Sequence, residues 1–465
     1  MARADLLAQS QTGWGAPPQT FMPVSAVISA LARSLLSGDP AVEQVHARAV
    51  RTLGRRWRWL RPLVARYVEH FAKRTRPRHR DVVRFLVDDP GFRNARAKYR
   101  HEISIEKWIA EPQRMLPADA AQRWDLPVIE SAGDLAHWLS ISVDELDWFA
   151  DLKALGNKLG NPKLQHYFYR ILPKRSGGFR MLETPKQRLK DLQRRILSGI
   201  LDRVPVHPSV HGFVRGRSIV TFAAPHTGKR LVLRLDLQDF FPAFPAARAQ
   251  ALFRTLGYPE SVADLLGGIC TNAVPRRTWR DPPPAADLAQ WHEARSLYAR
   301  PHLPQGAPTS PALANLTAFR LDCRLTGLAK SAGAVYTRYA DDLAFSGNEE
   351  FARAAKRFSA HAAAIALEEG FYVNHRKTRI LRQGVRQQLA GVVVNEKIGI
   401  RRRDREQLEA ILTNCIRFGP ESQNRAGVTD FRAHLEGRIG FIAMVDRQQG
   451  RRLKSLFDSI AWPTG

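Results

Sequence analysis

The chain is poor in cysteine and has no long apolar run. Its three cysteines, Cys270, Cys323 and Cys415, are far apart and lack metal-ligand spacing, so we interpret them as reduced, buried residues rather than as disulfides or zinc ligands. No stretch of about 18 apolar residues is present, and no N-terminal segment combines a basic start with an apolar core. We therefore expect no membrane span and no secretory signal, and we predict a cytoplasmic protein.

Acidic residues are scarce relative to basic ones. The 465 residues include 72 Lys and Arg but only 44 Asp and Glu, which gives a formal net charge of +28. A polyanionic partner is the simplest explanation for a chain that tolerates such self-repulsion. The positive charge therefore predicts nucleic acid as the partner. A membrane surface is the alternative, and the lack of an apolar run argues against it. The length suffices for two or three domains with substantial cores.

The most informative motif is Tyr339-Ala340-Asp341-Asp342. The flanking residues, 334–339 and 343–346, are rich in strand-forming types, which places the two acids at the tip of a predicted β-hairpin. Adjacent carboxylates repel each other unless a cation neutralises them, and such hard oxygen ligands suit Mg²⁺. A solvated turn is the ordinary alternative for an Asp-Asp pair.

A third acid, Asp236, ends the mostly apolar strand-like run 231–236. On a neighbouring strand it would complete a metal site with Asp341 and Asp342. Nucleotidyl transfer uses two metal ions about 3.5–4 Å apart, held by two or three carboxylates on a rigid sheet. We therefore predict that these three aspartates are the catalytic and metal-binding residues of a two-metal Mg²⁺ site.

These motifs resemble those of reverse transcriptases. The turn at residues 339–342 is similar to their metal-binding signature, and Asp236 with Phe240-Phe241 is similar to their first aspartate motif. Residues 305–311, which begin with Gln305, resemble the loop-to-helix motif beneath the templating base. The resemblance spans residues 165–400 and extends to a set of cations: Lys174 and Arg180, which resemble the residues that grip the incoming triphosphate, and Lys377, which resembles the lysine assigned to protonating pyrophosphate.

Each nucleotide-binding residue has a physical reason and an ordinary alternative. A triphosphate needs cations, which Lys174 and Arg180 would supply from a closing hairpin, although a plain basic hairpin has the same composition. In the resemblance, Phe241 takes the place of the aromatic residue that packs under the sugar and excludes a 2′-hydroxyl, which implies deoxynucleotide substrates. The alternative for Phe241 is a core phenylalanine. We assign the neighbouring Phe240 to the core, because strand side chains alternate between faces. Gln305 precedes a glycine that permits close approach to a base, or belongs to an ordinary loop.

Finer features resemble the bacterial retron branch, whose enzymes copy part of a structured non-coding RNA into DNA that stays attached to it. Residues 211–218 and 223–226 resemble the retron-specific insert, with Phe222 where that insert opens with asparagine. Gly391 is the retained residue of the retron Val-Thr-Gly element. The resemblance implies RNA-binding roles for His226 and Gly391, and a hydrogen-bonded structural histidine is the alternative for His226.

The chain divides into three predicted regions. Residues 1–125 form an N-terminal basic helical extension, in which residues 51–100 hold sixteen Lys or Arg against four acids. Apolar residues recur there at helical spacing from Leu60 to Phe71. The interleaved arginines and aromatics would bind phosphates and stack bases, or the aromatics would form the core of a bundle with a solvated basic face.

Residues 126–395 are predicted to be fingers and palm, with short helices leading in at residues 125–160, and residues 396–465 a helical thumb. In the thumb, Arg401, Arg402 and Arg403 would track the phosphates of an RNA–DNA product duplex, with a merely solvated helical surface as the competing interpretation.

Together these observations predict an α+β right-hand polymerase with fingers, a palm built on an antiparallel sheet, and a helical thumb. We expect an RNA-directed DNA polymerase that uses deoxynucleoside triphosphates and copies a structured non-coding RNA into RNA-linked single-stranded DNA (msDNA), in a retron antiphage system with a separate effector protein. The alternatives are a non-retron bacterial reverse transcriptase, intron-derived or stand-alone, and a non-catalytic RNA-binding scaffold. A scaffold would not need the aspartates, the fingers cations and Lys377 together.

Overall fold

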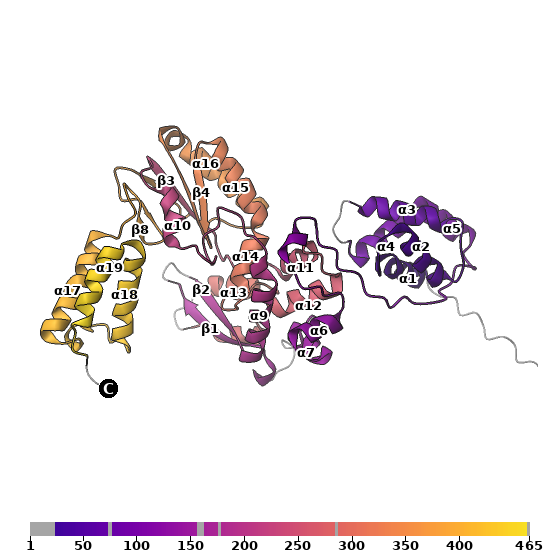
Figure 1. The fold of residues 1–465 in the computed structure, drawn as a ribbon, viewed down its shortest axis with the longest axis horizontal. Helices are drawn as coiled ribbons and strands as arrows, with labels where there is room; N and C mark the ends of the chain where they lie inside the picture. Colours follow the sequence, from indigo (N-terminus) through magenta and orange to yellow (C-terminus); the bar gives the residue numbers. More distant parts are fainter. Residues whose placement is uncertain (1–23, 73–76, 156–161, 175–177, 284–286, 463–465) are drawn as a thin grey trace, which may run out of the picture. The chain divides into compact units, whose positions relative to one another are not determined.

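The computed structural model describes residues 24–72, 77–155, 162–174, 178–283 and 287–462 (Figure 1). The chain falls into two compact units. The N-terminal unit runs to Leu116 and includes Gly257–Glu260, and the main unit comprises Pro117–Leu256 and Ser261–Gly465. All the catalytic, nucleotide-binding and RNA-binding candidates named above lie in the main unit.

The N-terminal unit is helical. Leu31, Leu60, Leu63 and Leu86 are fully buried in its core, so the helical spacing predicted after Leu60 is confirmed. Trp57 is 6% exposed and packs into the same core, which favours the interpretation of these aromatics as core residues rather than as base-stacking platforms. The described helices are α1 (Val24–Leu36), α2 (Val42–Leu53), α3 (Leu60–Phe71), α4 (His79–Asp88) and α5 (Pro90–Lys98).

Short helices lead into the main unit, as predicted for residues 125–160. They are α6 (Ala132–Leu139) and α7 (Val143–Ala150). Each begins with a capping box, in which a serine side chain and an acidic side chain three residues later bond each other's backbone N–H groups. The serines are Ser131 and Ser142. Because the caps satisfy the first N–H groups, even helices of two turns are stable once their leucines are buried.

A two-stranded antiparallel sheet follows, formed by β1 (Tyr167–Pro173) and β2 (Phe179–Pro185). The predicted hairpin therefore exists, and Lys174 and Arg180 lie at its end; residues 175–177 of its tip are outside the described residues. Trp279, Trp291 and Tyr298 pack against β2. The helices of this region are α9 (Gln187–Gly199), α11 (Ala246–Thr255), α12 (Glu260–Cys270), α13 (Leu288–Tyr298) and α14 (Ser310–Thr317).

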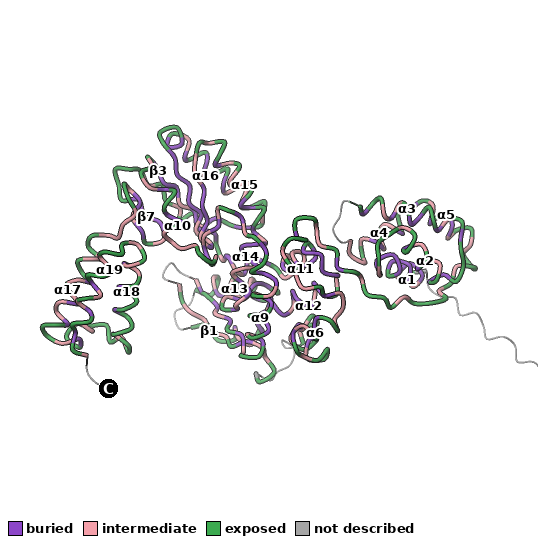
Figure 2. The backbone as a smooth tube through the Cα atoms, in the orientation of Figure 1, coloured by how far each residue is buried: buried purple, intermediate pink, exposed green. Residues whose placement is uncertain are grey.

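The centre of the main unit is a four-stranded antiparallel sheet with the order β4-β5-β3-β6. Helices α15 (Phe319–Ser331) and α16 (Glu349–Glu368) pack against it, and the short helix α10 (Ile219–Ala223) contacts β4 (Figure 1). The middle strands are buried on both sides, which explains their apolar sequences (Figure 2). The strands are β3 (Leu231–Asp236), β4 (Val335–Tyr339), β5 (Asp342–Gly347) and β6 (Arg379–Arg382). The predicted combination of helices with an antiparallel sheet is confirmed.

The β4–β5 hairpin is anchored by a fully buried ion pair. The side chains of Arg338 and Asp322 are both 0% exposed, and two guanidinium nitrogens donate to the two carboxylate oxygens at 2.8 Å. The Tyr336 hydroxyl also donates to Asp322 at 2.8 Å. The remaining Arg338 nitrogen donates to Asn315 Oδ1 at 3.0 Å and to the carbonyl of Ala340, in the turn itself, at 3.2 Å. Arg338 thus ties the turn to helices α14 and α15.

The C-terminal part is helical, as predicted from Arg401 onward. Leu412, Leu435 and Leu453 are fully buried in a core of their own. The helices are α17 (Arg402–Phe418), α18 (Phe431–Val445) and α19 (Arg447–Asp458), and a small hairpin of β7 (Gln388–Leu389) and β8 (Val392–Val393) precedes them. The turn of this hairpin holds Ala390 and Gly391, with φ of 44° and 89°, so Gly391 occupies a position where a residue without Cβ is favoured.

The expectation that all three cysteines are buried is wrong for Cys323. Cys270 and Cys415 are buried, but Cys323 is exposed on α15. Leu321, Asp322 and Leu325 form the buried face of that helix, which leaves position 323 on the solvent side. None of the described helices has the length and apolar content that crossing a bilayer requires.

The substitution Asp322→Ala tests the anchor, because it leaves the Arg338 guanidinium buried without its acceptors. We expect the free energy of unfolding of the main unit, measured by urea denaturation, to fall by about 3–5 kcal/mol. The control is Asp191→Ala, which removes an exposed partner of Arg194 one helical turn away and is expected to cost less than about 0.5 kcal/mol. A similar small loss for both variants would show that the pair does not anchor the hairpin.

Candidate active site

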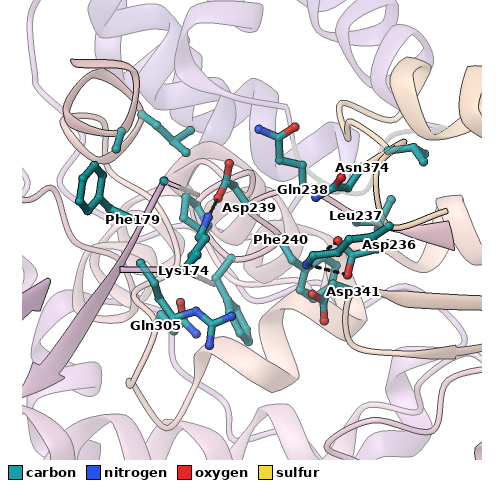
Figure 3. Close-up of a pocket in the computed structure, with 18 of the residues that line it drawn as sticks. Lys174, Phe179, Asp236, Leu237, Gln238, Asp239, Phe240, Gln305, Asp341 and Asn374 are labelled. Atoms are coloured by element: carbon teal, nitrogen blue, oxygen red, sulfur yellow. Dashed lines mark hydrogen bonds and ion pairs between the residues drawn. The ribbon is translucent and has the colours of Figure 1, made fainter. Parts of the chain in front are cut away.

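One cavity of about 750 Å³ in the main unit brings together residues from distant parts of the chain (Figure 3). Its walls come from the β1–β2 hairpin, the end of β3, the turn after β4 and the segment before β6. Seven residues predicted to bind metal or nucleotide line it: Lys174, Arg180, Asp236, Phe241, Gln305, Asp341 and Lys377.

Two carboxylates are held side by side at the end of the sheet. In the antiparallel register, Asp236 lies opposite Asp342, which places the two-residue turn of Ala340 and Asp341 beside the end of β3. The Leu237 N–H donates to the Asp341 carbonyl at 2.9 Å and fixes the turn to the strand. Figure 3 shows the Asp236 and Asp341 side chains close together. The hairpin predicted around the Asp-Asp pair is therefore confirmed.

The carboxyl group of Asp341 has a raised pKa. Burial, together with the neighbouring charges of Asp342 and Asp236, raises the pKa of its carboxyl from 3.8 to about 6. The positive charge of Lys377 lowers this pKa, but its effect is the smallest. Cations relieve repulsion of this kind, so the two carboxylates that face the cavity fit a divalent metal ion.

Asp342 is directed elsewhere. Its Oδ1 accepts hydrogen bonds from Arg234 Nε at 2.9 Å and Nη2 at 2.7 Å, and it is not among the residues that line the cavity. Burial raises the pKa of Asp342 although Arg234 lowers it. Within the described part of the chain, no group of three or more His, Cys, Asp or Glu side chains is arranged to hold a metal ion. The structure thus brings two of the three predicted ligands to the cavity and pairs the third with an arginine.

Two lysines of the cavity are already bound to acids. Lys377 Nζ lies 2.9 and 3.1 Å from the two oxygens of Asp236, and Lys174 Nζ lies 2.7 Å from Asp239 Oδ1. Arg180 is exposed. A bound triphosphate would therefore compete with Asp239 for Lys174, while Arg180 is accessible without any such exchange.

Phe241 and Gln305 line the cavity. Phe240 also reaches its wall, but with 5% exposure it belongs to the core, as predicted. The Gln305 carbonyl accepts from the Glu183 N–H at 2.9 Å, which fixes its loop to β2. A Cβ on Gly306 would lie 2.8 Å from the Glu183 carbonyl oxygen, so only glycine fits there. The close backbone approach made by this glycine is therefore to β2.

The predicted RNA-binding residues lie outside the cavity. His226 is fully buried, and its ring nitrogens are each 2.7 Å from the hydroxyls of Ser346 and Thr337; burial lowers its pKa to about 3. This geometry favours the structural alternative for His226. Arg401 donates to Gln388 and Arg402 pairs with Glu406, while Arg403 is exposed at the start of α17.

The comparisons with known proteins agree with this geometry. The family model described as reverse transcriptase (RNA-dependent DNA polymerase) matches residues 172–401. Retron Mx65 reverse transcriptase of Myxococcus xanthus is 42% identical over 346 residues, which is 73% of this chain and 74% of that protein. This chain belongs to the retron-type bacterial reverse transcriptases. The Mx162 enzyme of the same organism is 36% identical over 340 residues (70% of this chain, 66% of the relative), and the Ec86 enzyme of Escherichia coli is 30% identical over 336 residues (70% and 88%).

The retron-type reverse transcriptase is accordingly an RNA-directed DNA polymerase, as predicted, with an RNA template and deoxynucleoside triphosphates as substrates. Enzymes of this family generally use divalent metal ions, typically Mg²⁺.

The sequence patterns did not single out two side chains of this reverse transcriptase, one paired with Asp342 and one in the wall of the cavity. Arg234, the partner of Asp342, is the one basic residue in an otherwise apolar strand, and its position two residues before Asp236 could have marked it. Phe213 lines the cavity with 54% exposure and an unusual φ of 59°, and its ring centroid lies 6.3 Å from that of Phe241. Its exposure and strained backbone at the cavity make Phe213 a candidate substrate contact; the sequence pattern marked it only as part of the insert-like segment 211–218.

The raised pKa of Asp341 makes the stability of the metal-free protein depend on pH. Because the folded pKa is about 6 and the ordinary value 3.8, the destabilising charge develops as pH rises through this interval and is complete above it. We expect Mg²⁺ to raise the thermal unfolding midpoint at about pH 8 and to have little effect at about pH 4.5, where Asp341 is protonated.

The matched variant for this measurement is Asp341→Asn. It should unfold at a higher temperature than the wild type at about pH 8 in the presence of a chelator, and it should gain less from Mg²⁺. Asp191→Asn, on an exposed helix face, serves as the control and should respond as the wild type does. Equal responses of wild type and Asp341→Asn to Mg²⁺ would contradict the assignment of the cation to this carboxylate.

Proposed function

We propose that this reverse transcriptase makes msDNA, a single-stranded DNA that remains joined to the structured non-coding RNA from which it was copied. The observation that carries the proposal is the similarity to three retron enzymes over at least 70% of the chain. We propose further that it works in the cytoplasm as part of an antiphage system with a separate effector protein, as the retron resemblance implies.

The proposed right hand follows from the arrangement of the sheets. The β1–β2 sheet with its surrounding helices supplies the fingers, and the four-stranded sheet with α15 and α16 supplies the palm. Helices α17 to α19, with a core of their own, supply the thumb. The domain limits that we propose are residues 1–125 for the basic helical extension, 126–395 for fingers and palm, and 396–465 for the thumb.

Asp236 and Asp341 are the residues that we propose to hold Mg²⁺, and Asp342 helps to orient the turn through its bond to Arg234. A two-metal centre, when bound, lowers the pKa of the primer hydroxyl and neutralises the leaving pyrophosphate. Lys377 holds the Asp236 carboxylate in the free enzyme. On substrate binding it is placed to give a proton to pyrophosphate.

The nucleotide pocket is formed by the remaining residues of the cavity. Lys174 leaves Asp239 and binds the triphosphate, so the triphosphate replaces Asp239 as the anionic partner of Lys174. Arg180 binds the triphosphate without breaking an ion pair. Phe241 packs beneath the sugar and excludes a 2′-hydroxyl. Gln305, fixed to β2, lies beneath the templating base.

The product duplex is proposed to follow the thumb. Arg403 is exposed at the start of α17, and Arg402 makes only an exposed pair with Glu406, so both can turn to phosphates at little cost. Arg401, bonded to Gln388, ties this helix to the β7–β8 hairpin that contains Gly391, which supports a role for that hairpin in holding the RNA.

The substitution Asp341→Asn tests the catalytic assignment. Removing one carboxylate from the cavity should reduce primer extension on an RNA template with deoxynucleotides by at least about 10³-fold, because transition-state charge is then poorly neutralised. RNA affinity, measured by filter binding, should change less than about threefold, since the phosphate contacts are elsewhere. Asp191→Asn is the control and should retain wild-type extension. Extension by Asp341→Asn at more than a tenth of the wild-type rate would refute the assignment.

The nucleic acid bound to the protein tests the retron proposal. The protein, expressed with its flanking DNA and purified, should carry one discrete DNA species joined to RNA through a 2′–5′ bond, detected by sequencing after separate RNase, DNase and debranching treatments. Protein carrying Asp341→Asn should carry the RNA without the DNA. A heterogeneous RNA pool, or DNA without an RNA branch, would place the enzyme in another class of reverse transcriptase.

A further inference from the structure

The N-terminal unit contains a cluster of aromatic rings covered by cations. The rings of Trp57 and Tyr99 lie 5.0 Å apart, and those of Trp59 and Phe92 lie 5.3 Å apart, so the connection between α2 and α3 packs along α5, from its first turn to the residue after its end. We name these four rings, with the cations over and beside them, the aromatic–cation cluster. Its rings come from two segments more than thirty residues apart in the sequence, and the fold brings them together.

Three of the cations sit directly over the rings. The guanidinium of Arg55 is 4.1 Å from the centre of the Trp57 ring, that of Arg96 is 5.8 Å from Phe92, and the ammonium of Lys98 is 5.4 Å from Tyr99. At these separations a ring attracts a cation by about 0.5–1 kcal/mol at an exposed site. The charged groups are therefore held close to the surface of the unit instead of moving freely in solvent.

Further cations flank the cluster and lack acidic partners. Arg56, Arg58 and Arg100 are exposed, and within the described residues none of them has a hydrogen bond or ion pair to an acid. The acids nearest these residues among those described are Asp89, Glu102 and Glu106, and Asp89 is paired with Arg66 at 2.7 Å. Glu102 pairs with Arg55 at 3.1 Å, with both side chains more than half exposed, and Glu106 lies beside Gly54. The cluster thus keeps a positive excess that the protein itself does not neutralise.

The exposure of the rings defines what this surface can recognise. Trp57 is 6% exposed and Phe92 is fully buried, so neither can stack on a base. None of the cluster's rings is among the large exposed apolar residues of the described chain, so the surface offers nothing to insert into a lipid bilayer. What remains is a set of cations, three held over rings and three exposed and unpaired among the described residues, which matches the regular charges of a phosphodiester backbone.

We propose that the aromatic–cation cluster binds the phosphate backbone of RNA and is a second nucleic-acid contact of this enzyme, on a unit separate from the catalytic cavity. The choice of RNA as the polyanion rests on the enzyme's being an RNA-directed polymerase. Binding at the cluster is independent of base sequence, because its contacts go to phosphates alone. It adds affinity for the RNA and contributes nothing to the chemistry of nucleotide addition.

The test compares two triple variants of the full chain that remove the same charge. The first, Arg56→Ala/Arg58→Ala/Arg100→Ala, removes the unpaired cations of the cluster. The second, Arg51→Ala/Arg61→Ala/Arg80→Ala, removes exposed cations of the same unit that already pair with acids. The probe is a labelled single-stranded RNA of mixed sequence, titrated at several salt concentrations, and thermal unfolding verifies that both variants are folded.

We expect the cluster variant to bind this RNA about 10–100-fold more weakly at about 0.1 M salt, and its salt slope to fall by about 2, since each lost phosphate contact removes about 0.7. The paired-cation variant should stay within about threefold of the wild type. Equal affinity in the cluster variant and the wild type, or equal losses in the two variants, would overturn the proposal.

Two further measurements distinguish this proposal from the polymerase assignment and from membrane binding. Primer extension on a saturating short RNA–DNA primer–template should be within about twofold of the wild type in both variants, because the catalytic cavity is unchanged. Failure of extension by the wild type would overturn the polymerase assignment while leaving the binding result intact. With phosphatidylglycerol vesicles as a membrane probe, the two variants should behave alike; loss of vesicle binding with retained RNA binding in the cluster variant would overturn the choice of RNA.

Discussion

The geometry of the candidate catalytic cavity depends on one buried ion pair. Arg338 and Asp322 are removed from water entirely, and the same guanidinium that neutralises Asp322 also bonds the carbonyl of Ala340 in the turn. A desolvated charge of this kind tolerates few alternative positions, because each lost hydrogen bond leaves a buried donor unpaired. The turn is consequently held where the carboxylate of Asp341 must stand beside Asp236, in spite of the repulsion between them.

Near this ion pair, two lysines of the cavity are paired with aspartates. Lys377 neutralises Asp236 and Lys174 neutralises Asp239, so the free enzyme satisfies internally the groups that substrate and metal would otherwise satisfy. Asp341 has no such partner among the described residues, and burial together with the charges of Asp342 and Asp236 raises its pKa to about 6. A triphosphate at Lys174 would therefore exchange one ion pair for another, whereas a cation at Asp341 would form a new one.

Much of this was predictable because it depends on local pattern. Strand-forming residues on both sides of an Asp-Asp pair predict a hairpin. An acid that ends an apolar strand predicts a site where the strands of the sheet end. Asp236 and Asp341 were therefore predicted to lie together. The partnership of Asp342 with Arg234 was not found, since the choice between metal and arginine depends on side-chain direction across two strands. The burial of His226 and the exposure of Cys323 likewise depend on which face of an element meets the sheet.

The position of Phe213 shows the same limit more sharply. Its backbone strain exists only because residues 209–211 are bonded to β4 through Arg338, and Gly212 approaches Ala340 so closely that a Cβ there would lie 2.6 Å from the Ala340 nitrogen. Close approaches between segments more than 120 residues apart leave no periodic pattern in the sequence of either segment. They become visible only when the fold is assembled.

The most direct test of the account is to locate a metal ion experimentally. Crystals of the enzyme with an RNA–DNA primer–template, a deoxynucleoside triphosphate and Mn²⁺ should give an anomalous peak in contact with the carboxylates of both Asp236 and Asp341, with Lys377 displaced from Asp236. An ordered nucleotide in the cavity with manganese bound elsewhere, or with Asp341 contacting no metal, would contradict the claim that the anchored hairpin exists to present that carboxylate.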